Sequence, residues 1–163
     1  MPSRIRPLAY IFGLPSVLLG LIPWYLMRFS QTGKAPFGLL LTVSGVLLCL
    51  AGAALLFSGA YYLIRRGDGT PLSCDPPKRM VVSGPYAHIQ HPMLLGFFCM
   101  ALGEACWFQS FSLGLYSGVI ALSAHLFVIF REEPRLKERF GRDYEAYQTV
   151  TPRWLPLPSS SLC

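Results

Sequence analysis

The stretch FGLLLTVSGVLLCLAGAALLFSGAYYLI, residues 37–64, decides the fold because it contains no charged residue from one end to the other. A helix needs about 20 apolar residues to cross the hydrocarbon core of a membrane. This stretch is longer, so a helix formed by it can tilt or extend into the interface. It therefore predicts one membrane-spanning helix, and the rest of the chain can be placed around it.

Three further apolar stretches predict three more spans. Residues 8–27 and 111–130 contain no Lys, Arg, Asp or Glu, and residues 93–108 contain one such residue, Glu104. Only Gln109 and Ser110 separate the last two stretches, which predicts a tight helical hairpin and leaves open whether both of its helices cross completely. We expect an all-α integral membrane protein, a single domain over residues 1–163 with four transmembrane helices.

The basic start of the chain, residues 1–7, is also compatible with a signal peptide. The apolar run that follows is longer than the usual central region of about 7–15 residues, and no A-x-A cleavage site comes after it. We therefore expect this first helix to be retained.

Composition points to the same class of protein. The chain of 163 residues is 53% hydrophobic and 13% charged, whereas soluble domains contain about 25% charged residues. The net charge of +6 lies between the apolar runs, so we interpret it as a signal for membrane orientation and expect no nucleic-acid partner. The five cysteines form no CxxC pair, so we expect neither a disulfide framework nor a metal site.

Lys and Arg divide unequally between the segments that connect the predicted spans. With four spans, Arg28 and Lys34 fall on one side, and the other side receives twelve: Arg4, Arg6, Arg65, Arg66, Lys78, Arg79, Arg131, Arg135, Lys137, Arg139, Arg142 and Arg153. The positive-inside rule makes the side with twelve cytoplasmic. Both termini would then be cytoplasmic, in a plasma membrane or a bacterial inner membrane.

The first cytoplasmic segment, residues 65–92, is rich in Gly and Pro and is expected to be a loop of turns. It ends at His91-Pro92, and because Pro is favoured at the first helical position, Pro92 is expected to start the third span. His88 and His91 are spaced to share a face. They are either site residues or two solvated histidines of an interfacial loop.

The second cytoplasmic segment, residues 131–163, is expected to contain an amphipathic helix that lies in the membrane interface and breaks at Gly141. Such a helix is commonly only an anchor, but an anchor would favour Lys or Arg where Glu132 and Glu133 stand. Two polar residues inside the spans have two interpretations each. Glu104 either has a function or reaches water near the 109–110 turn, and His125 either lines a cavity or bonds a neighbouring helix.

Two blocks of motifs in these polar segments resemble the membrane methyltransferases, which include isoprenylcysteine carboxyl methyltransferase and the related phospholipid methyltransferases. The first block is Gly69-Thr-Pro, Pro76-Pro, Ser83-Gly-Pro-Tyr, His91-Pro-Met and Gly96, and the second is Glu132-Glu-Pro-x-Leu, Phe140-Gly, Tyr144, Tyr147 and Pro152-Arg-Trp-Leu-Pro. The resemblance covers about half of the chain. It is specific because both blocks occur in the right order, with a hairpin between them.

The resemblance implies an enzyme that transfers a methyl group from S-adenosyl-L-methionine to a lipophilic small molecule or a lipidated acceptor that enters from the bilayer. It implies a cofactor site at the cytoplasmic face, between the first block and the acidic pair. The implied catalytic residues are His91 and Glu133, and the implied cofactor contacts are Tyr86, His91, Pro92, Met93, Gly96, Glu132, Glu133, Tyr144 and Tyr147.

The chain departs from the family pattern at four positions. The family commonly has Arg where this chain has Ala87 and Gln90, Tyr where it has Leu94, and often a basic residue where it has Val150. Fewer cations disfavour an anionic acceptor. The missing arginines keep open the alternative of a non-enzymatic membrane bundle that binds lipid or a partner subunit. A second alternative is an NADPH-dependent membrane reductase of the sterol type, which shares part of the C-terminal pattern of aromatic residues and Gly.

Overall fold

The computed structural model describes residues 16–29, 38–67 and 80–154, and within these ranges the regular structure is entirely helical. The elements are η1 (Val17–Leu21), α2 (Ile22–Phe29), α3 (Gly38–Gly67), η2 (Gly84–Ala87), α4 (Pro92–Phe108), α5 (Phe111–Phe127), η3 (Val128–Glu132), α6 (Glu133–Phe140) and α7 (Arg142–Val150). The predictions for residues 1–15, 30–37, 68–79 and 155–163 fall outside the described residues.

Two helical stretches of the described chain are long and apolar enough to cross a membrane, Gly38–Gly67 and Phe111–Phe140. Two shorter apolar helices, Val17–Arg28 and Pro92–Phe108, accompany them. Large hydrophobic side chains lie exposed along α3 and α5, as at Leu39 and Phe111, which is 87% exposed. Exposed apolar faces of this extent match a lipid environment rather than water. The prediction of an all-helical fold is confirmed for the described residues, and the two long apolar helices support membrane character. The count of four spans stays a prediction.

The fourth predicted span does not end at Phe130. The helix runs on from α5 through the π-helical turn η3 into α6, which ends at Phe140. The segment after residue 130 is helical as expected, and its first helix continues directly from the fourth apolar stretch. Its position in the membrane interface stays a prediction. Pro134 lacks a backbone N–H, and the wider turn directly before it lets the helix pass this missing hydrogen bond without a break. The break expected at Gly141 is confirmed: its φ of 55° is unfavourable for other residues.

Helices α3 and α4 pack tightly along a line of glycines. Gly45, Gly52 and Gly59 of α3 are buried against α4, on which Gly96 and Gly103 face back. A Cβ added at Gly52 would lie 2.5 Å from the Gly96 carbonyl oxygen, and one at Gly96 would lie 2.6 Å from the Gly52 carbonyl oxygen. The absence of side chains lets the two backbones approach closely, as small residues do in membrane helix pairs.

The hairpin between α4 and α5 has the length that was expected. Gln109 adopts a left-handed conformation with φ 51°, and Ser110 caps α5 by accepting a hydrogen bond from the Leu113 N–H at 3.4 Å. The Gln109 side chain donates to the Gly38 carbonyl oxygen at 3.0 Å, so the turn is tied to the start of α3.

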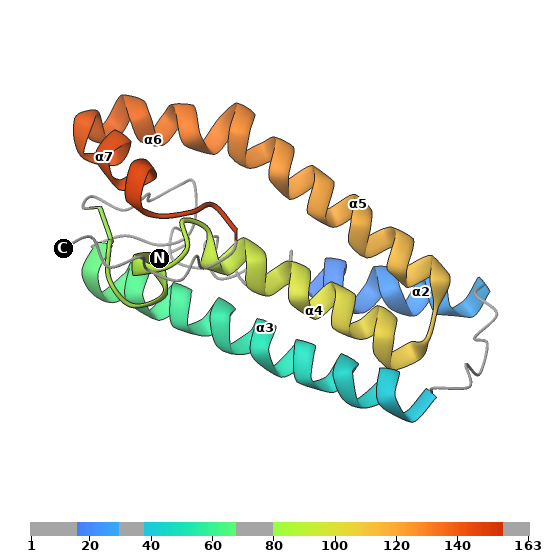
Figure 1. Ribbon diagram of the computed structural model, residues 1–163. Helices are drawn as coiled ribbons and strands as arrows, with labels where there is room; N and C mark the ends of the chain where they lie inside the picture. The colour runs from blue at the N-terminus through green and yellow to red at the C-terminus, as the bar shows by residue number, and fades with distance from the viewer. Residues whose placement is uncertain (1–15, 30–37, 68–79, 155–163) are drawn as a thin grey trace, which may run out of the picture.

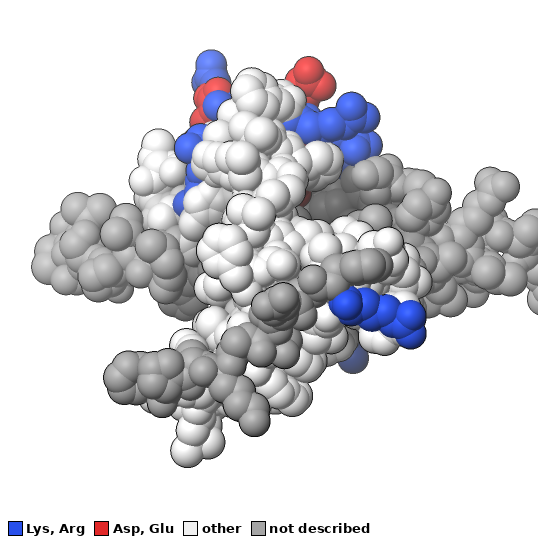
Figure 2. Space-filling view, turned by 90° about the vertical axis from the view of Figure 1, so that its right-hand side faces the viewer, with Lys and Arg blue, Asp and Glu red and all other residues white. Residues whose placement is uncertain are grey.

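Most of the described charges lie at the opposite end of the bundle from this turn, with Arg28 and Glu104 as exceptions. Figure 1 shows the end of α3, the start of α4, α6 and α7 together at one end, and α2 and the α4–α5 turn at the other. Figure 2 looks at the end with the turn, where much of the described surface is uncharged; charged side chains lie at the top of the view, and a further Lys or Arg group lies lower, at the right. Of the twelve Lys and Arg residues expected on one side, the eight that the structure describes belong to the elements at this end, and the orientation in a membrane stays a prediction.

Candidate functional site

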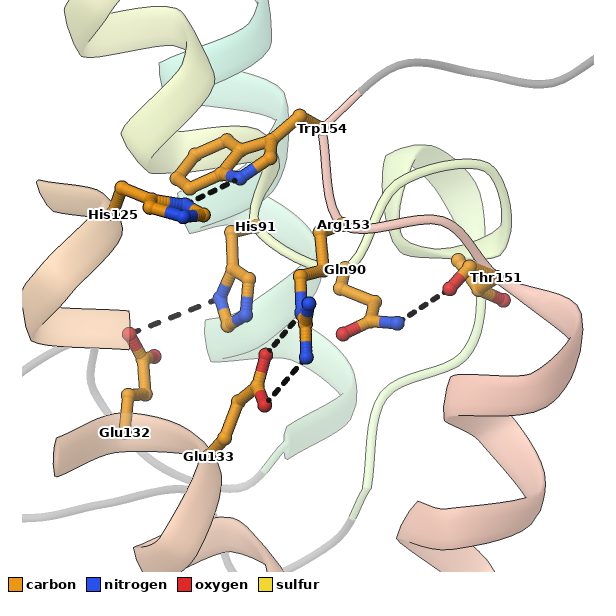
Figure 3. Close-up of polar contacts among 8 residues, drawn as sticks. All are labelled: Gln90, His91, His125, Glu132, Glu133, Thr151, Arg153 and Trp154. Carbon is orange, nitrogen blue, oxygen red and sulfur yellow. Dashed lines mark hydrogen bonds and ion pairs between the residues drawn. The ribbon is translucent and has the colours of Figure 1, made fainter. Parts of the chain in front are cut away.

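Three segments that are distant in the sequence meet at the charged end of the bundle. They are residues 80–91 before α4, the junction of α5 and α6, and residues 151–154 after α7 (Figures 1 and 3). We call residues 151–154 the strap, because they lie across the start of α4 and are bonded to both other segments.

Glu133 and Arg153 form the strongest polar contact between these segments. Arg153 donates from Nε to Oε1 of Glu133 at 2.6 Å and from Nη2 to Oε2 at 3.1 Å, a bidentate ion pair. The Glu133 side chain is 8% exposed and that of Arg153 is 47% exposed. Hydrogen bonding to the Glu133 carboxylate raises the pKa of Arg153. The strap therefore compensates a buried negative charge at the head of α6.

His91 lies beside this pair as the residue that precedes α4. Its side chain is 5% exposed, and Nδ1 lies 3.8 Å from Oε2 of Glu132, a separation too long for a hydrogen bond. Burial lowers the pKa of His91 to about 4, although Glu133 opposes the shift. The imidazole is therefore neutral at pH 7, and its buried Nε2 has no hydrogen-bond partner among the described residues.

Trp154 lies between two histidines. Its Nε1 donates to Nδ1 of His125 at 3.2 Å. Its ring centroid lies 6.0 Å from that of His125 and 6.1 Å from that of His91. Of the two interpretations of His125, the structure supports the bond to a neighbouring segment, but that segment is the strap rather than another span (Figure 3).

Gln90 ties the strap to the loop before α4. Its backbone N–H donates to the Pro152 carbonyl oxygen at 3.0 Å, and its side-chain Nε2 donates to the Thr151 carbonyl oxygen. A further link lies nearby, where the Tyr147 hydroxyl donates to the Tyr86 carbonyl oxygen at 2.6 Å. These three bonds hold the strap and α7 against residues 86–90.

The three predicted tyrosines lie around the same cluster. Tyr144 is 3% exposed, and its hydroxyl has no hydrogen-bond partner among the described residues. Burial raises the pKa of Tyr144 to about 12, with further contributions from Glu133 and Glu132. Burial also raises the pKa of Tyr86 and Tyr147. All three phenols are therefore neutral at pH 7 and can donate a hydrogen bond.

The remaining predicted contacts lie partly elsewhere. Pro92 is fully buried at the start of α4, where it was expected. Met93 lies against Gly59, and Gly96 packs on the backbone of Gly52, so both positions face α3. The structure gives these two residues a packing role, and their contact with a cofactor stays a prediction. His88 is exposed while His91 is buried, so the two histidines do not share an environment.

The site contains residues that the sequence did not single out for it: Gln90, Thr151, Arg153 and Trp154. Arg153 and Trp154 belong to the C-terminal motif, which was the available signal, but no spacing rule predicts that they would reach Glu133 and His125. Glu104, in contrast, lies in the last turns of α4, far along the helix from the cluster.

Comparisons with known proteins identify a family and one curated relative. The family model for phospholipid methyltransferases matches residues 40–143. Protein-S-isoprenylcysteine O-methyltransferase of Schizosaccharomyces pombe is 33% identical over 78 residues, which are 48% of this chain and 33% of that protein. The matched region thus spans a third of the length of this curated relative. No solved structure matches the chain.

Proposed function

Because this chain belongs to the phospholipid methyltransferase family, we propose that it transfers a methyl group from S-adenosylmethionine to a lipophilic acceptor at one face of a membrane. The observation that carries the proposal is the pair of buried, unpartnered atoms Gln90 Oε1 and His91 Nε2 beside the acidic pair. Buried polar atoms without partners are rare in folded proteins, so such a pair in one place suits a bound polar ligand.

The chemistry of this cluster fits the cofactor. S-adenosylmethionine supplies an electrophilic methyl group on a sulfonium and also carries an ammonium and a carboxylate group, so its net charge is positive. Glu132 and Glu133 offer two carboxylates, of which Glu133 is paired with Arg153 and Glu132 lies in the electrostatic field of Arg135, so the site offers hydrogen-bond acceptors for an ammonium group without an excess of negative charge. We assign these carboxylates, His91 and the backbone at Pro92 to the binding of the cofactor, and Tyr86, Tyr144 and Tyr147 to the walls around it.

In this proposal the residues act mainly by alignment and by excluding water. Methyl transfer is an in-line displacement in which positive charge disperses, so it gains most from a positioned pair of reactants in a dry site. His91 is buried and neutral at pH 7 because its pKa lies near 4. His91 therefore acts as a hydrogen-bonding group beside Glu133. It does not act as a general base, because the protonated imidazole is unfavourable at this buried position.

The acceptor class follows from the relatives. The curated relative is named for methylation of a protein's isoprenylcysteine, and the family is named for phospholipids. Both kinds of molecule carry long apolar chains, so we propose an acceptor of that kind, delivered by the surrounding lipid. The exposed apolar faces of α3 and α5 support a protein in contact with lipid.

We also propose that the chain crosses the membrane four times with the site on the cytoplasmic side. The charged end of the bundle in Figure 1 is the end at which the site lies, and an excess of Lys and Arg marks cytoplasmic segments. A cysteine-free variant with a single cysteine at Gln109 or at Arg139 tests this. A membrane-impermeant maleimide should label Gln109→Cys from outside intact cells and Arg139→Cys only after lysis, and the reverse pattern would contradict the orientation.

The cofactor proposal is tested by calorimetric binding of S-adenosylhomocysteine to the detergent-purified protein. We expect the wild type to bind it and Glu133→Gln to lose at least about tenfold in affinity, as for the loss of a charged hydrogen-bond partner. Glu138→Gln, at an exposed position of the same helix, is the matched control and should bind as the wild type does. No binding by a folded wild type would refute the proposed function.

A further inference from the structure

The nitrogen and the oxygen of the Gln90 side-chain amide differ in their hydrogen bonding. Nε2 donates to the Thr151 carbonyl oxygen, whereas Oε1 is buried and has no hydrogen-bond partner among the described residues. The opposite orientation of the amide would place Oε1 against the Thr151 carbonyl oxygen, so that two acceptors would face each other. The contact with the strap therefore fixes Oε1 as the free end.

The free oxygen faces the site rather than the surface. Gln90 is 7% exposed, and Figure 3 shows its oxygen on the side of the amide that faces Arg153 and Glu133, away from Thr151. The next residue, His91, also has a buried and unpartnered atom, Nε2. Two adjacent residues thus have buried hydrogen-bonding atoms without partners inside one cluster. Such atoms cost folding free energy, and a ligand that bonds to them would remove this cost.

Most of the polar side-chain atoms in this cluster are hydrogen-bond acceptors, so the cluster favours a ligand group that donates hydrogen bonds. The carboxylates of Glu132 and Glu133 and the amide oxygen of Gln90 only accept hydrogen bonds, and two of the five N–H groups of Arg153 are directed at Glu133. An ammonium group has three donors and no acceptor, so it needs several acceptors around it.

On the premise of the cofactor proposed above, we propose that Gln90 is a further ligand-binding residue, whose Oε1 accepts a hydrogen bond from the α-ammonium of the cofactor. The same side chain holds the strap through Thr151. Gln90 thereby links occupation of the site to the position of the C-terminal segment that covers it.

The experiment must separate ligand contact from the tie to the strap. Binding of S-adenosylhomocysteine and of its analogue without the α-amino group is measured by calorimetry on the full-length protein in detergent. The proteins are the wild type, Gln90→Met, which keeps the length of the side chain without its hydrogen bonds, and Tyr147→Phe. Tyr147→Phe removes the neighbouring hydrogen bond to the Tyr86 carbonyl oxygen and leaves Gln90 intact. It therefore measures how much ligand affinity is lost when α7 is held less firmly.

We expect Gln90→Met to weaken binding of S-adenosylhomocysteine by at least about tenfold more than binding of the analogue, as for the loss of a hydrogen bond to a charged group. Tyr147→Phe should weaken both ligands by the same factor. An equal effect of Gln90→Met on the two ligands would mean that Gln90 only ties the strap and would overturn the inference. A folded wild type that binds neither ligand would overturn the proposed cofactor together with this inference.

Gln90→Glu is the second variant in case Gln90→Met does not fold. It loses the donor to Thr151 but keeps an acceptor oxygen at the same place. We expect it to prefer S-adenosylhomocysteine over the analogue at least as strongly as the wild type does. A reduced preference would contradict a contact between this position and the ammonium.

Discussion

The guanidinium of Arg153 donates two hydrogen bonds, of 2.6 Å and 3.1 Å, to the carboxylate of Glu133, which lies 20 residues earlier in the sequence. Glu133 is the buried member of the pair and begins α6, whereas Arg153 is half exposed on the strap. The pair therefore joins the end of the long α5–α6 helix to the segment that covers His91. Its loss should affect both the fold and the site.

Arg153→Ala is expected to lower the free energy of unfolding by about 1–2 kcal/mol, because it leaves a buried carboxylate without its charged donor, while water reaching the half-exposed arginine limits the loss. Thermal unfolding in detergent measures the effect. Arg153→Lys should recover part of the stability, since an ammonium cannot form both bonds. Arg142→Ala, an exposed cation at the start of α7, should unfold as the wild type does, and an equal loss there would show that net charge alone matters.

Acid should destabilise the protein through His91. Burial lowers its pKa to about 4 from an ordinary 6.5, so between these two pH values the unfolded chain binds more protons at this site than the folded protein. Stability therefore falls as the pH drops from about 6.5 to 4.

His91→Asn should flatten this dependence, because asparagine does not titrate. The unfolding midpoint is measured in steps between pH 4 and 7.5, and its slope against pH is compared between the variant and the wild type. His88→Asn removes an exposed histidine three residues earlier and should keep the slope of the wild type. A slope unchanged in His91→Asn would exclude His91 as its source.

The two tyrosines of α7 should respond differently to loss of the hydroxyl. Tyr147→Phe removes the bond to the Tyr86 carbonyl oxygen and should cost about 1 kcal/mol of stability. Tyr144→Phe removes a hydroxyl that has no hydrogen-bond partner among the described residues, so the protein without ligand should keep its stability. Thermal unfolding of the two variants side by side measures the difference, and a greater loss for Tyr144→Phe would contradict it.

The contact between α3 and α4 should not tolerate a methyl group. Gly52→Ala places its Cβ 2.5 Å from the Gly96 carbonyl oxygen, and the two backbones must separate, at a cost of about 1–3 kcal/mol or more. Gly114→Ala is the matched control on α5, where an added Cβ meets nothing within 4 Å and alanine favours the helix. Unfolding midpoints should fall for Gly52→Ala and stay level or rise for Gly114→Ala. Equal midpoints would refute the close packing.

The sequence predicted the helices well where composition and local chemistry decide them. Pro92 starts α4, Gln109 and Ser110 form the hairpin, and Gly141 ends α6, because each depends on residues next to it in the chain. The sequence also suggested that His91, Glu132, Glu133 and Tyr144 belong together, through the resemblance of their motifs. It did not show that the helix of the fourth apolar stretch continues to Phe140, because apolar composition ends at Phe130 while the helix does not.

By itself, the sequence determined that this is an apolar helical chain with its charges at one end, since burial of apolar surface and placement of charge depend on the order of residues alone. Only the tertiary structure decided which polar atoms meet. Arg153 reaches Glu133, Trp154 reaches His125, and Gln90 reaches Thr151 because the strap folds back over the start of α4. Such contacts depend on the angles between packed helices and on the turn η3, which no periodicity along the chain encodes.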